Sequence, residues 1–325
     1  MKRRLSLALL GLVSASALMA PLCTFAQTEY PDKPIRLVVP YPPGGATDVS
    51  ARLVATEMGK SLGQSIIVEN KPGAAGVVGT DMVVKAAPDG YTLVFGGPGN
   101  LTLRPIMDSK VPYDVEKDLI PISHIVTYDH LLLVRKDLPA KNVKEFVEAA
   151  KSGKLTYGSS GTGGPQHLAM ELFEYMTKTK MTHVPYKGES PALVDLVGGR
   201  VDAAILTSAV AGQMIKNGSV RLLAATNPYR SKTFPDAPTV SEAGVPGYEM
   251  ISYGGLLAPA GTPAPVIEKL EQAAVAAMKV PAIQEQFYKA GLFPIGGTAN
   301  EFRDLLRSER AKWTPIIKNA GVTLE

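Results

Sequence analysis

Residues 40–48 read PYPPGGATD and follow IRLVV (35–39), a short apolar run rich in β-branched residues. The next segment, from Thr47 to Lys60, has apolar residues at helical spacing. This pattern predicts a strand, a loop stiffened by three prolines, and then a helix over 47–60. The stretch therefore indicates a βα unit, and the rest of the chain repeats that unit.

The bare backbone of this loop indicates a binding role. Gly44 and Gly45 carry no side chain, so a ligand can approach the backbone closely there. The helix that follows points free N–H groups and the positive end of its dipole at the same gap, which favours an anion such as a carboxylate. The alternative is a tight turn in which Thr47 or Asp48 caps the helix, although Asp48 can also hold a water that bridges to a ligand.

Strand-like runs alternate with helical patterns along most of the chain. Helices are expected over 47–60, 76–86, 142–151, 165–178, 190–197 and 209–216, and three more after Thr262, which start at Pro263, at Pro281 and after an Asn300 cap. Alternation of this kind predicts the α/β class, with parallel sheets covered by helices on both faces.

Two extended stretches flank the second half of this alternation. PISHIVTYDHLLLV (121–134) and YEMISYGGLLAP (248–259) are expected to cross between two lobes. This organisation gives lobe 1 from residues 27–124 plus 253–325 and lobe 2 from residues 125–252. The alternative is a single, continuous, doubly wound sheet.

The N-terminus has the pattern of a secretory signal peptide. Three basic residues (2–4) precede an apolar run over 5–20, and we place cleavage after Ala26, so that residues 1–26 are removed. A membrane anchor is the alternative, but the run is short and interrupted by glycine and serine. The single cysteine, Cys23, leaves with the signal, so the mature chain needs no disulfide and holds no thiolate metal site. We expect a periplasmic protein.

A second loop resembles the first in composition but is richer in polar side chains. YGSSGTGGPQH (157–167) combines the hydroxyls of Ser159, Ser160 and Thr162 with the bare amide of Gly163 at a helix start. Hydroxyls and amides that converge in this way favour an anion. The loop lacks the Lys and the final Ser/Thr of a phosphate-binding P-loop, so we expect no nucleotide. The alternative is a serine- and glycine-rich turn without a ligand.

A third loop, GGPGN (96–100), follows the strand-like run YTLVF. Its backbone is bare at Gly97, and Asn100 offers a donor and an acceptor. Arg104 follows shortly after and can form a bidentate pair with a second carboxylate on the ligand. The alternative is an arginine on the surface.

The sequence contains no complete motif of a known catalytic site. HExxH, GxSxG and a complete dinucleotide fingerprint are all missing from the sequence. Ser160 with His167 is the one pair that suggests a nucleophile and a base, and it lacks the geometry of a nucleophile elbow. Tyr186 follows a strand in VPYKG and can stack on a ligand or pack at its rim. We expect no catalysis, no cofactor and no metal.

Several motifs occur in an order that resembles one known family. YPPGGATD, VENKPGAAGVVGTDMVVKAAPDGYTL, LTYGSSGTGGPQHLAMELF, HVPYKGESPALVDLVGGRVD and LLAPAGTP are similar to the Bug-type periplasmic receptors of tripartite tricarboxylate transporters. The resemblance covers nearly the whole mature chain. It implies a two-lobed type II periplasmic binding protein fold that closes on a small carboxylate. It also implies that Tyr41–Asp48 and Ser159–His167 grip the carboxylate like pincers, partly through ordered waters.

The chain departs from the family pattern at several positions. Leu206 and Thr207 stand where an Asp-Asn pair is common, and TYDH (127–130) replaces an apolar-Pro-Asn stretch. The charge lost at 206 and the arginine gained at 104 argue against a cationic ligand and favour a dicarboxylate, including one with an aromatic centre.

These observations predict a monomeric receptor that delivers its ligand to an inner-membrane permease, without nucleic-acid binding. A sensor subunit with a signalling partner and a secreted hydrolase are the alternatives. The candidate ligand-binding residues are Tyr41, Gly44, Gly45, Asp48, Gly97, Asn100, Arg104, Ser159, Ser160, Thr162, Gly163, His167, Tyr186 and Thr207.

Overall fold

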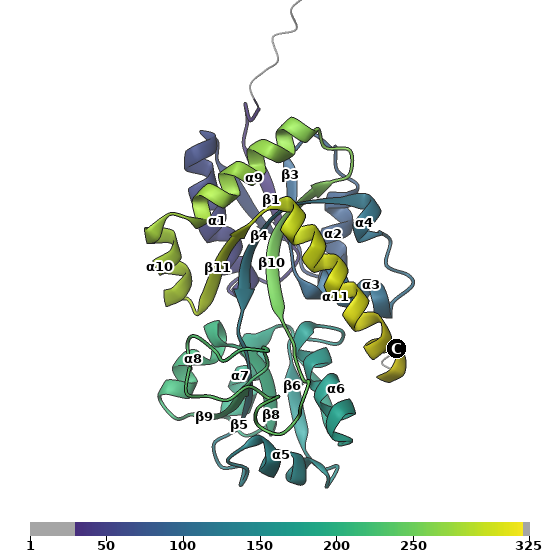
Figure 1. The fold of residues 1–325 in the computed structure, drawn as a ribbon, viewed down its shortest axis with the longest axis vertical. Coiled ribbons are helices and arrows are strands. Elements are labelled where there is room, and N and C mark those ends of the chain that lie inside the picture. Colours follow the sequence, from purple (N-terminus) through teal and green to yellow (C-terminus); the bar gives the residue numbers. More distant parts are fainter. Residues whose placement is uncertain (1–29, 321–325) are drawn as a thin grey trace, which may run out of the picture.

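The computed structural model describes residues 30–320 and folds them into two lobes, one above the other in Figure 1. The two lobes have separate sheets, one of six strands and one of five, so a single continuous sheet is excluded for this part of the chain. The predicted signal peptide, residues 1–26, lies outside the described residues. Within residues 30–320, no helix is both long enough and apolar enough to cross a bilayer.

Lobe 1 is built on the six-stranded sheet, with strand order β11-β4-β10-β3-β1-β2. Its strands are β1 (Ile35–Val39), β2 (Ile66–Asn70), β3 (Thr92–Gly96), β4 (Leu119–Tyr128), β10 (Ser252–Pro259) and β11 (Leu292–Gly297). Its helices are α1 (Ala46–Leu62), η1 (Ala74–Gly76), α2 (Val77–Val84), η2 (Gly99–Leu103), α3 (Arg104–Met107), α4 (Val115–Asp118), α9 (Ala264–Met278), α10 (Pro281–Lys289) and α11 (Ala299–Ala320).

Lobe 2 is built on the five-stranded sheet, with strand order β7-β6-β8-β5-β9. Its strands are β5 (His130–Arg135), β6 (Thr156–Ser159), β7 (Thr182–Pro185), β8 (Ala203–Thr207) and β9 (Val220–Ala225). Its helices are α5 (Val143–Ala150), α6 (Pro165–Thr177), α7 (Glu189–Val197) and α8 (Ser208–Lys216).

The predicted α/β class is confirmed, but neither sheet is purely parallel. β1 pairs in parallel with β2 and β3, and β10 lies between β3 and β4 and pairs antiparallel with both. In lobe 2, β6 is parallel to β7 and β8, whereas β5 is antiparallel to β8 and β9. The strands that run against the others are β10 and β11 in lobe 1 and β5 in lobe 2.

Two features of the C-terminal segment differ from the sequence prediction. β11 was not expected among the helices there, although its apolar LFPIG run follows a glycine turn. The cap of α11 is formed by Thr298 and not by Asn300: the Glu301 N–H donates to Thr298 Oγ1, and the Thr298 N–H donates to Glu301 Oε2. This reciprocal pair is a capping box, for which TANE is a recognisable signature.

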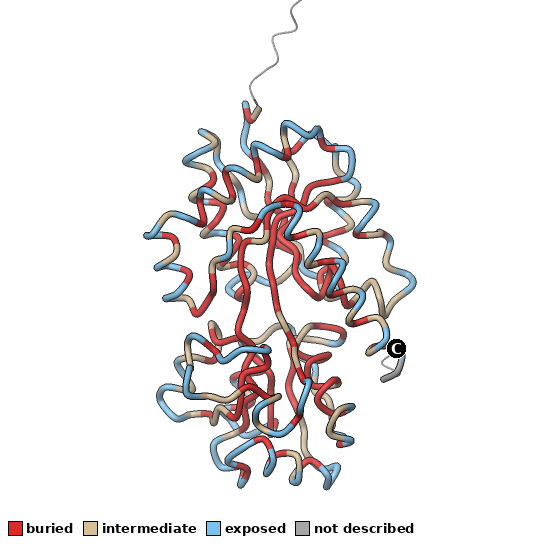
Figure 2. Tube along the Cα trace, viewed as in Figure 1, coloured by how far each residue is buried: buried red, intermediate tan, exposed pale blue. Residues whose placement is uncertain are grey.

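The lobes are joined where β4 ends and β5 begins, with Asp129 alone between the two strands. The carboxylate of Asp129 is buried and accepts hydrogen bonds from Asn227 Nδ2 (2.6 Å) and Ser231 Oγ (2.5 Å). This contact ties the first crossing to the segment that leads back toward β10. Both crossing strands are buried along most of their length (Figure 2). The chain therefore changes from one sheet to the other at Asp129 and returns between β9 and β10.

Helix α11 begins on lobe 1 and reaches α6 of lobe 2, as its yellow ribbon shows in Figure 1. Trp313 and Ile317, near its end, belong to the same buried apolar cluster as Leu168 and Phe173 of α6. The lobes therefore have a second contact, an apolar one, in addition to the junction at Asp129.

Candidate functional site

A cavity of about 680 Å³ lies between the lobes. Its walls are the connections that follow β1, β2 and β3 in lobe 1 and β6, β7 and β8 in lobe 2. All of these lie at the carboxyl ends of strands, where open α/β sheets bind their ligands. The sequence prediction that the binding loops meet in a cleft agrees with this arrangement.

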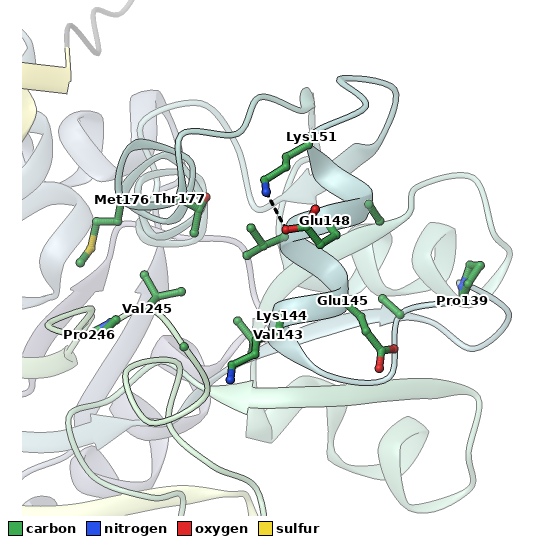
Figure 3. Close-up of a pocket in the computed structure, with 14 residues that line it drawn as sticks. Pro139, Val143, Lys144, Glu145, Glu148, Lys151, Met176, Thr177, Val245 and Pro246 are labelled. Carbon is green, nitrogen blue, oxygen red and sulfur yellow. Dashed lines mark hydrogen bonds and ion pairs between the residues drawn. The ribbon is translucent and has the colours of Figure 1, made fainter.

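A second hollow, of about 730 Å³, lies on lobe 2 along α5 and the end of α6 (Figure 3). Its charged residues include Glu148 and Lys151, which pair with each other at 2.6 Å. The start of α5 is capped there by Asn142, whose side chain accepts from the Glu145 N–H at 2.9 Å. This hollow therefore offers no uncapped helix start, and the cavity between the lobes is the candidate site.

Several uncapped helix N-termini converge on the cavity between the lobes. The N-cap residues of α1, α2, α6, α7 and α8 all line it, and within the described chain none has a side-chain cap: Gly45, Gly76, Gly164, Gly188 and Thr207. Of the helices that start elsewhere, α4 and α5 are capped by Asp114 and Asn142, whereas α9 and α10 have no side-chain cap among the described residues. Uncapped N–H groups and aligned dipoles make the cavity a site for negative charge.

The first loop is held in shape by Asp48. Its carboxylate is buried and accepts bonds from the Gly44 N–H (2.9 Å), Asn70 Nδ2 (2.9 Å) and Arg52 Nε (3.1 Å). Burial raises the pKa of Asp48, but the bonds from Arg52, Gly44 and Asn70 outweigh it and leave the pKa below its usual value. Asp48 thus braces the loop from behind, and the N-cap of α1 is Gly45 and not Thr47 or Asp48.

The two glycines of this loop have different roles. Gly44 has φ +83°, a left-handed conformation that side chains rarely adopt. Gly45 has φ −81°, and a Cβ built on it would lie 4.0 Å from its nearest neighbour, the Pro42 carbonyl oxygen. Gly44 is therefore needed for the turn, whereas the lack of a side chain at Gly45 leaves room in the cavity.

The third loop is fixed by Asn100, which is fully buried. Its Oδ1 accepts from the Gly97 N–H and from the Tyr41 hydroxyl, each at 3.0 Å, and its Nδ2 donates to Thr80 Oγ1 at 2.8 Å. The donor and the acceptor that the sequence analysis assigned to the ligand are therefore both engaged by residues of lobe 1. Gly97 and the ring of Tyr41 line the cavity instead.

Arg104 does not line the cavity. It starts the short helix α3, and its guanidinium pairs with Asp108 one turn later at 3.1 Å. The predicted pairing of Arg104 with a second ligand carboxylate therefore has no geometric support.

The second loop has a cavity face and a supporting face. Ser160 and Thr162 line the cavity. Ser159 lies behind them and its hydroxyl contacts His183 Nε2 at 2.6 Å. The Gly163 N–H donates to His167 Nδ1 at 3.1 Å, and the rings of His167 and His183 stack with their centroids 4.0 Å apart. These histidines hold the loop in position and do not line the cavity.

The pair that suggested a hydrolase does not form. The Ser160 hydroxyl donates to Gln166 Oε1, and His167 Nδ1 is occupied by the Gly163 N–H. Tyr186 lines the cavity, but its hydroxyl donates to Asp195 at 2.7 Å, so the ring is its contact surface.

The sequence analysis missed several polar residues of lobe 2 that line the cavity, and three of them lie close together. Gln166, Glu189 and His130 all line the cavity. Gln166 and Glu189 form a network with Thr207, and Gln166 Nε2 lies 3.4 Å from His130 Nε2. Burial lowers the pKa of His130 to about 4, so its ring is neutral. A sequence signal for Glu189 existed: it is an acidic residue in the first turn of a helix that follows a strand.

The predicted site residues thus fall into two groups. Those that line the cavity are Tyr41, Gly45, Gly97, Ser160, Thr162, Tyr186 and Thr207. Those that do not line it are Gly44, Asp48, Asn100, Arg104, Ser159, Gly163 and His167. All of the second group except Arg104 hydrogen-bond within the loops that form the cavity wall.

Comparison with known proteins agrees with this geometry. Residues 50–322 match the tripartite tricarboxylate transporter family receptor. The chain belongs to this receptor family. It is 34% identical over 327 residues to Protein BugT of Bordetella pertussis, with 98% of each chain covered. The resemblance to Bug-type receptors that the sequence motifs suggested is therefore confirmed.

Solved structures of relatives have the same fold as this receptor. Rpa4515 of R. palustris, solved with adipate, is 34% identical with a TM-score of 0.85, covering 90% of this chain and 99% of its own. MatC from Rhodopseudomonas palustris, solved with bound malate, is 32% identical with a TM-score of 0.83, covering 89% and 100%. The two-lobed periplasmic binding protein fold is thus confirmed.

Proposed function

We propose that this receptor binds a small carboxylate in the periplasm by closing its lobes and delivers it to the membrane permease of a tripartite tricarboxylate transporter. The observation that carries the proposal is the convergence of five uncapped helix N-termini on one cavity. A ligand carboxylate supplies the hydrogen-bond acceptor that the Asp114 and Asn142 caps supply to helices α4 and α5, and it adds a negative charge.

Closure of the lobes on the ligand explains why both lobes contribute helix starts to the cavity. The α1 and α2 starts belong to lobe 1, and the α6, α7 and α8 starts belong to lobe 2. A carboxylate bound to both sets of N–H groups links the lobes, so binding favours the closed arrangement. The relatives solved with adipate and malate support a carboxylate ligand. The sequence analysis expected a second ligand carboxylate from the charge lost at 206 and the arginine gained at 104; Arg104 lies outside the cavity, so the proposal names one carboxylate only.

The test is a calorimetric titration of the mature protein with a panel of small carboxylates and with the uncharged amide of each. Carboxylates that bind should raise the melting temperature, and their amides should bind at least about tenfold more weakly, because a hydrogen bond to a charged group stabilises by roughly 1.5–3 kcal/mol. Equal binding of acid and amide would contradict an anion site. Mass spectrometry after long incubation should recover the ligand unchanged, and turnover would contradict a receptor role.

A further inference from the structure

Two charged side chains, Lys187 and Glu189, line the cavity between the lobes. Lys187 is exposed, and Glu189 is partly buried. Within the described part of the chain, neither takes part in an ion pair of 4.0 Å or less. The cavity therefore contains a carboxylate without a cationic partner, beside helix starts that favour anions.

Glu189 is held by donors on both of its oxygens. Oε1 accepts from Gln166 Nε2 at 2.9 Å, and Oε2 accepts from the N–H and the hydroxyl of Thr207, each at 2.7 Å. Two of these donors are N–H groups that cannot accept a proton in return, which favours the ionised form. Burial nevertheless raises the pKa of Glu189, since no cation compensates its charge. A ligand cation placed beside it would remove that cost.

Glu189 also lies at the starts of two helices, α7 and α8, that would otherwise be free to bind the ligand. It is the first residue of α7, and it accepts from the N–H of Thr207, the N-cap of α8. The starts of α7 and α8 have no side-chain cap in the part of the chain that the structure describes, but a negative charge of the protein already lies beside them. The starts of α2 and α6 have no acidic residue in the first turn, and Asp48 in the first turn of α1 is directed into its own loop by the Gly44 N–H, which leaves these three starts for an anion and Glu189 at the other end.

The neighbouring hydroxyls extend this acceptor surface. Ser160 donates to Gln166 Oε1 and Thr207 donates to Glu189, so each has already used its single donor. What these two hydroxyls offer a ligand is their lone pairs. A second ligand carboxylate at this end would meet acceptors and a like charge, whereas an ammonium group would meet partners.

We propose that Glu189 selects a carboxylate that carries a cationic nitrogen at its opposite end. This inference depends on the carboxylate-receptor function proposed above and names its ligand class. Leu206, where the sequence lacks a charge, is buried in an apolar cluster and does not line the cavity, so the carboxylate at this end of the cavity is that of Glu189, which accepts from Thr207 at 2.7 Å. This proposal differs from the dicarboxylate that the sequence analysis expects, and the comparison of ligands below distinguishes the two.

The experiment compares aliphatic carboxylates of equal chain length whose far ends are ammonium, methyl or carboxylate, over a series of lengths. Each is titrated by calorimetry into the wild type and into Glu189→Gln. Gln keeps an acceptor for Thr207 and removes the charge, so it separates a charge-selecting role from helix capping. Glu148→Gln, which makes the same change on α5 in the outer hollow of Figure 3, is the matched control.

At the best length, the wild type should bind the ammonium carboxylate at least about tenfold more tightly than the methyl and dicarboxylate analogues. Glu189→Gln should lose that preference and bind the dicarboxylate more tightly than the wild type does, whereas Glu148→Gln should behave as the wild type. If the carboxylates bind but the wild type shows no preference for the ammonium end, Glu189 does not select the ligand and the receptor function stands. If no carboxylate binds, the receptor function and this inference both fail. The wild-type comparison decides the matter even if Glu189→Gln does not fold.

Discussion

The backbone N–H of Gly44 donates a hydrogen bond of 2.9 Å to Oδ2 of Asp48, one turn into helix α1. This bond directs the carboxylate back into its own loop and leaves the Gly45 N-cap free to face the cavity. The loop thus keeps its acidic residue away from an anionic ligand and uses it to hold the binding backbone in place.

Replacing Asp48 with Ala should therefore lower the free energy of unfolding, and it should affect ligand binding only through the shape of the loop. It removes bonds to Gly44, Arg52 and Asn70 and leaves the amide donors unpaired, a loss of about 1–3 kcal/mol. Asp48→Asn, which keeps one acceptor, should lose less. Urea unfolding of the two apo variants measures the difference. An Ala variant as stable as the wild type, yet unable to bind, would mean that Asp48 contacts the ligand directly.

Arg104→Ala should leave ligand affinity within about twofold of the wild type. Its guanidinium pairs with Asp108 and does not line the cavity, and loss of such a pair costs at most about 1 kcal/mol of stability. Lys187→Ala is the informative comparison, because Lys187 lines the cavity. This variant removes a positive charge from the cavity and should bind any carboxylate more weakly than the wild type does. Calorimetry on both variants separates the cases. Strong loss in Arg104→Ala together with none in Lys187→Ala would place the ligand elsewhere.

The pH dependence of stability should contain a contribution from Glu174. This side chain is buried, and burial, followed by the nearby Glu171, raises its pKa to about 7 from 4.5. The folded state thus keeps a proton that the unfolded chain loses, so stability is full below about pH 4.5 and falls as pH rises toward 7.

Glu174→Gln should abolish that fall and stabilise the protein above pH 7 by up to about 3 kcal/mol, since each pKa unit corresponds to about 1.36 kcal/mol. Glu148→Gln, an exposed carboxylate on the same lobe, should keep the wild-type profile. Denaturant unfolding at several pH values is the measurement. Parallel profiles for the wild type and Glu174→Gln would show that Glu174 is ionised in the folded state.

Local sequence patterns predicted the two lobes, the crossing strands and two bare loops that line the cavity, because each depends on neighbouring residues. Gly45, Ser160 and Thr162 line the cavity as the bare or hydroxyl-rich loops suggested. The direction in which a side chain points was harder to predict. Asn100 and His167 lie in the predicted loops but bond within their own lobes.

The residues that the sequence analysis missed depend on contacts between distant segments. Glu189 meets Thr207 across 18 positions and Gln166 across 23, so no local pattern shows that these side chains form one network. The same limit explains the wrong expectation for Arg104. Its guanidinium pairs with Asp108, four residues later, and the sequence alone did not show whether it would pair there or reach a ligand. Strand β11 was missed because its partner, β4, is also distant in sequence.

The central claim is that uncapped helix starts bind the ligand carboxylate, and Gly45→Asp tests it most directly. Asp at the N-cap supplies the charge internally, and Gly45 has the backbone angles and the space to accept a side chain. Gly45→Asn offers a neutral cap of the same shape, and Gly212→Asp places the same charge on α8 outside the cavity lining. The apo melting temperature of each variant checks its fold.

In calorimetric titrations with a carboxylate that the wild type binds, Gly45→Asp should show no detectable binding. Gly45→Asn should bind more weakly than the wild type, and Gly212→Asp should bind as the wild type does. Wild-type affinity in a folded Gly45→Asp variant would contradict the account, because a carboxylate would then be bound at a helix start that already carries one.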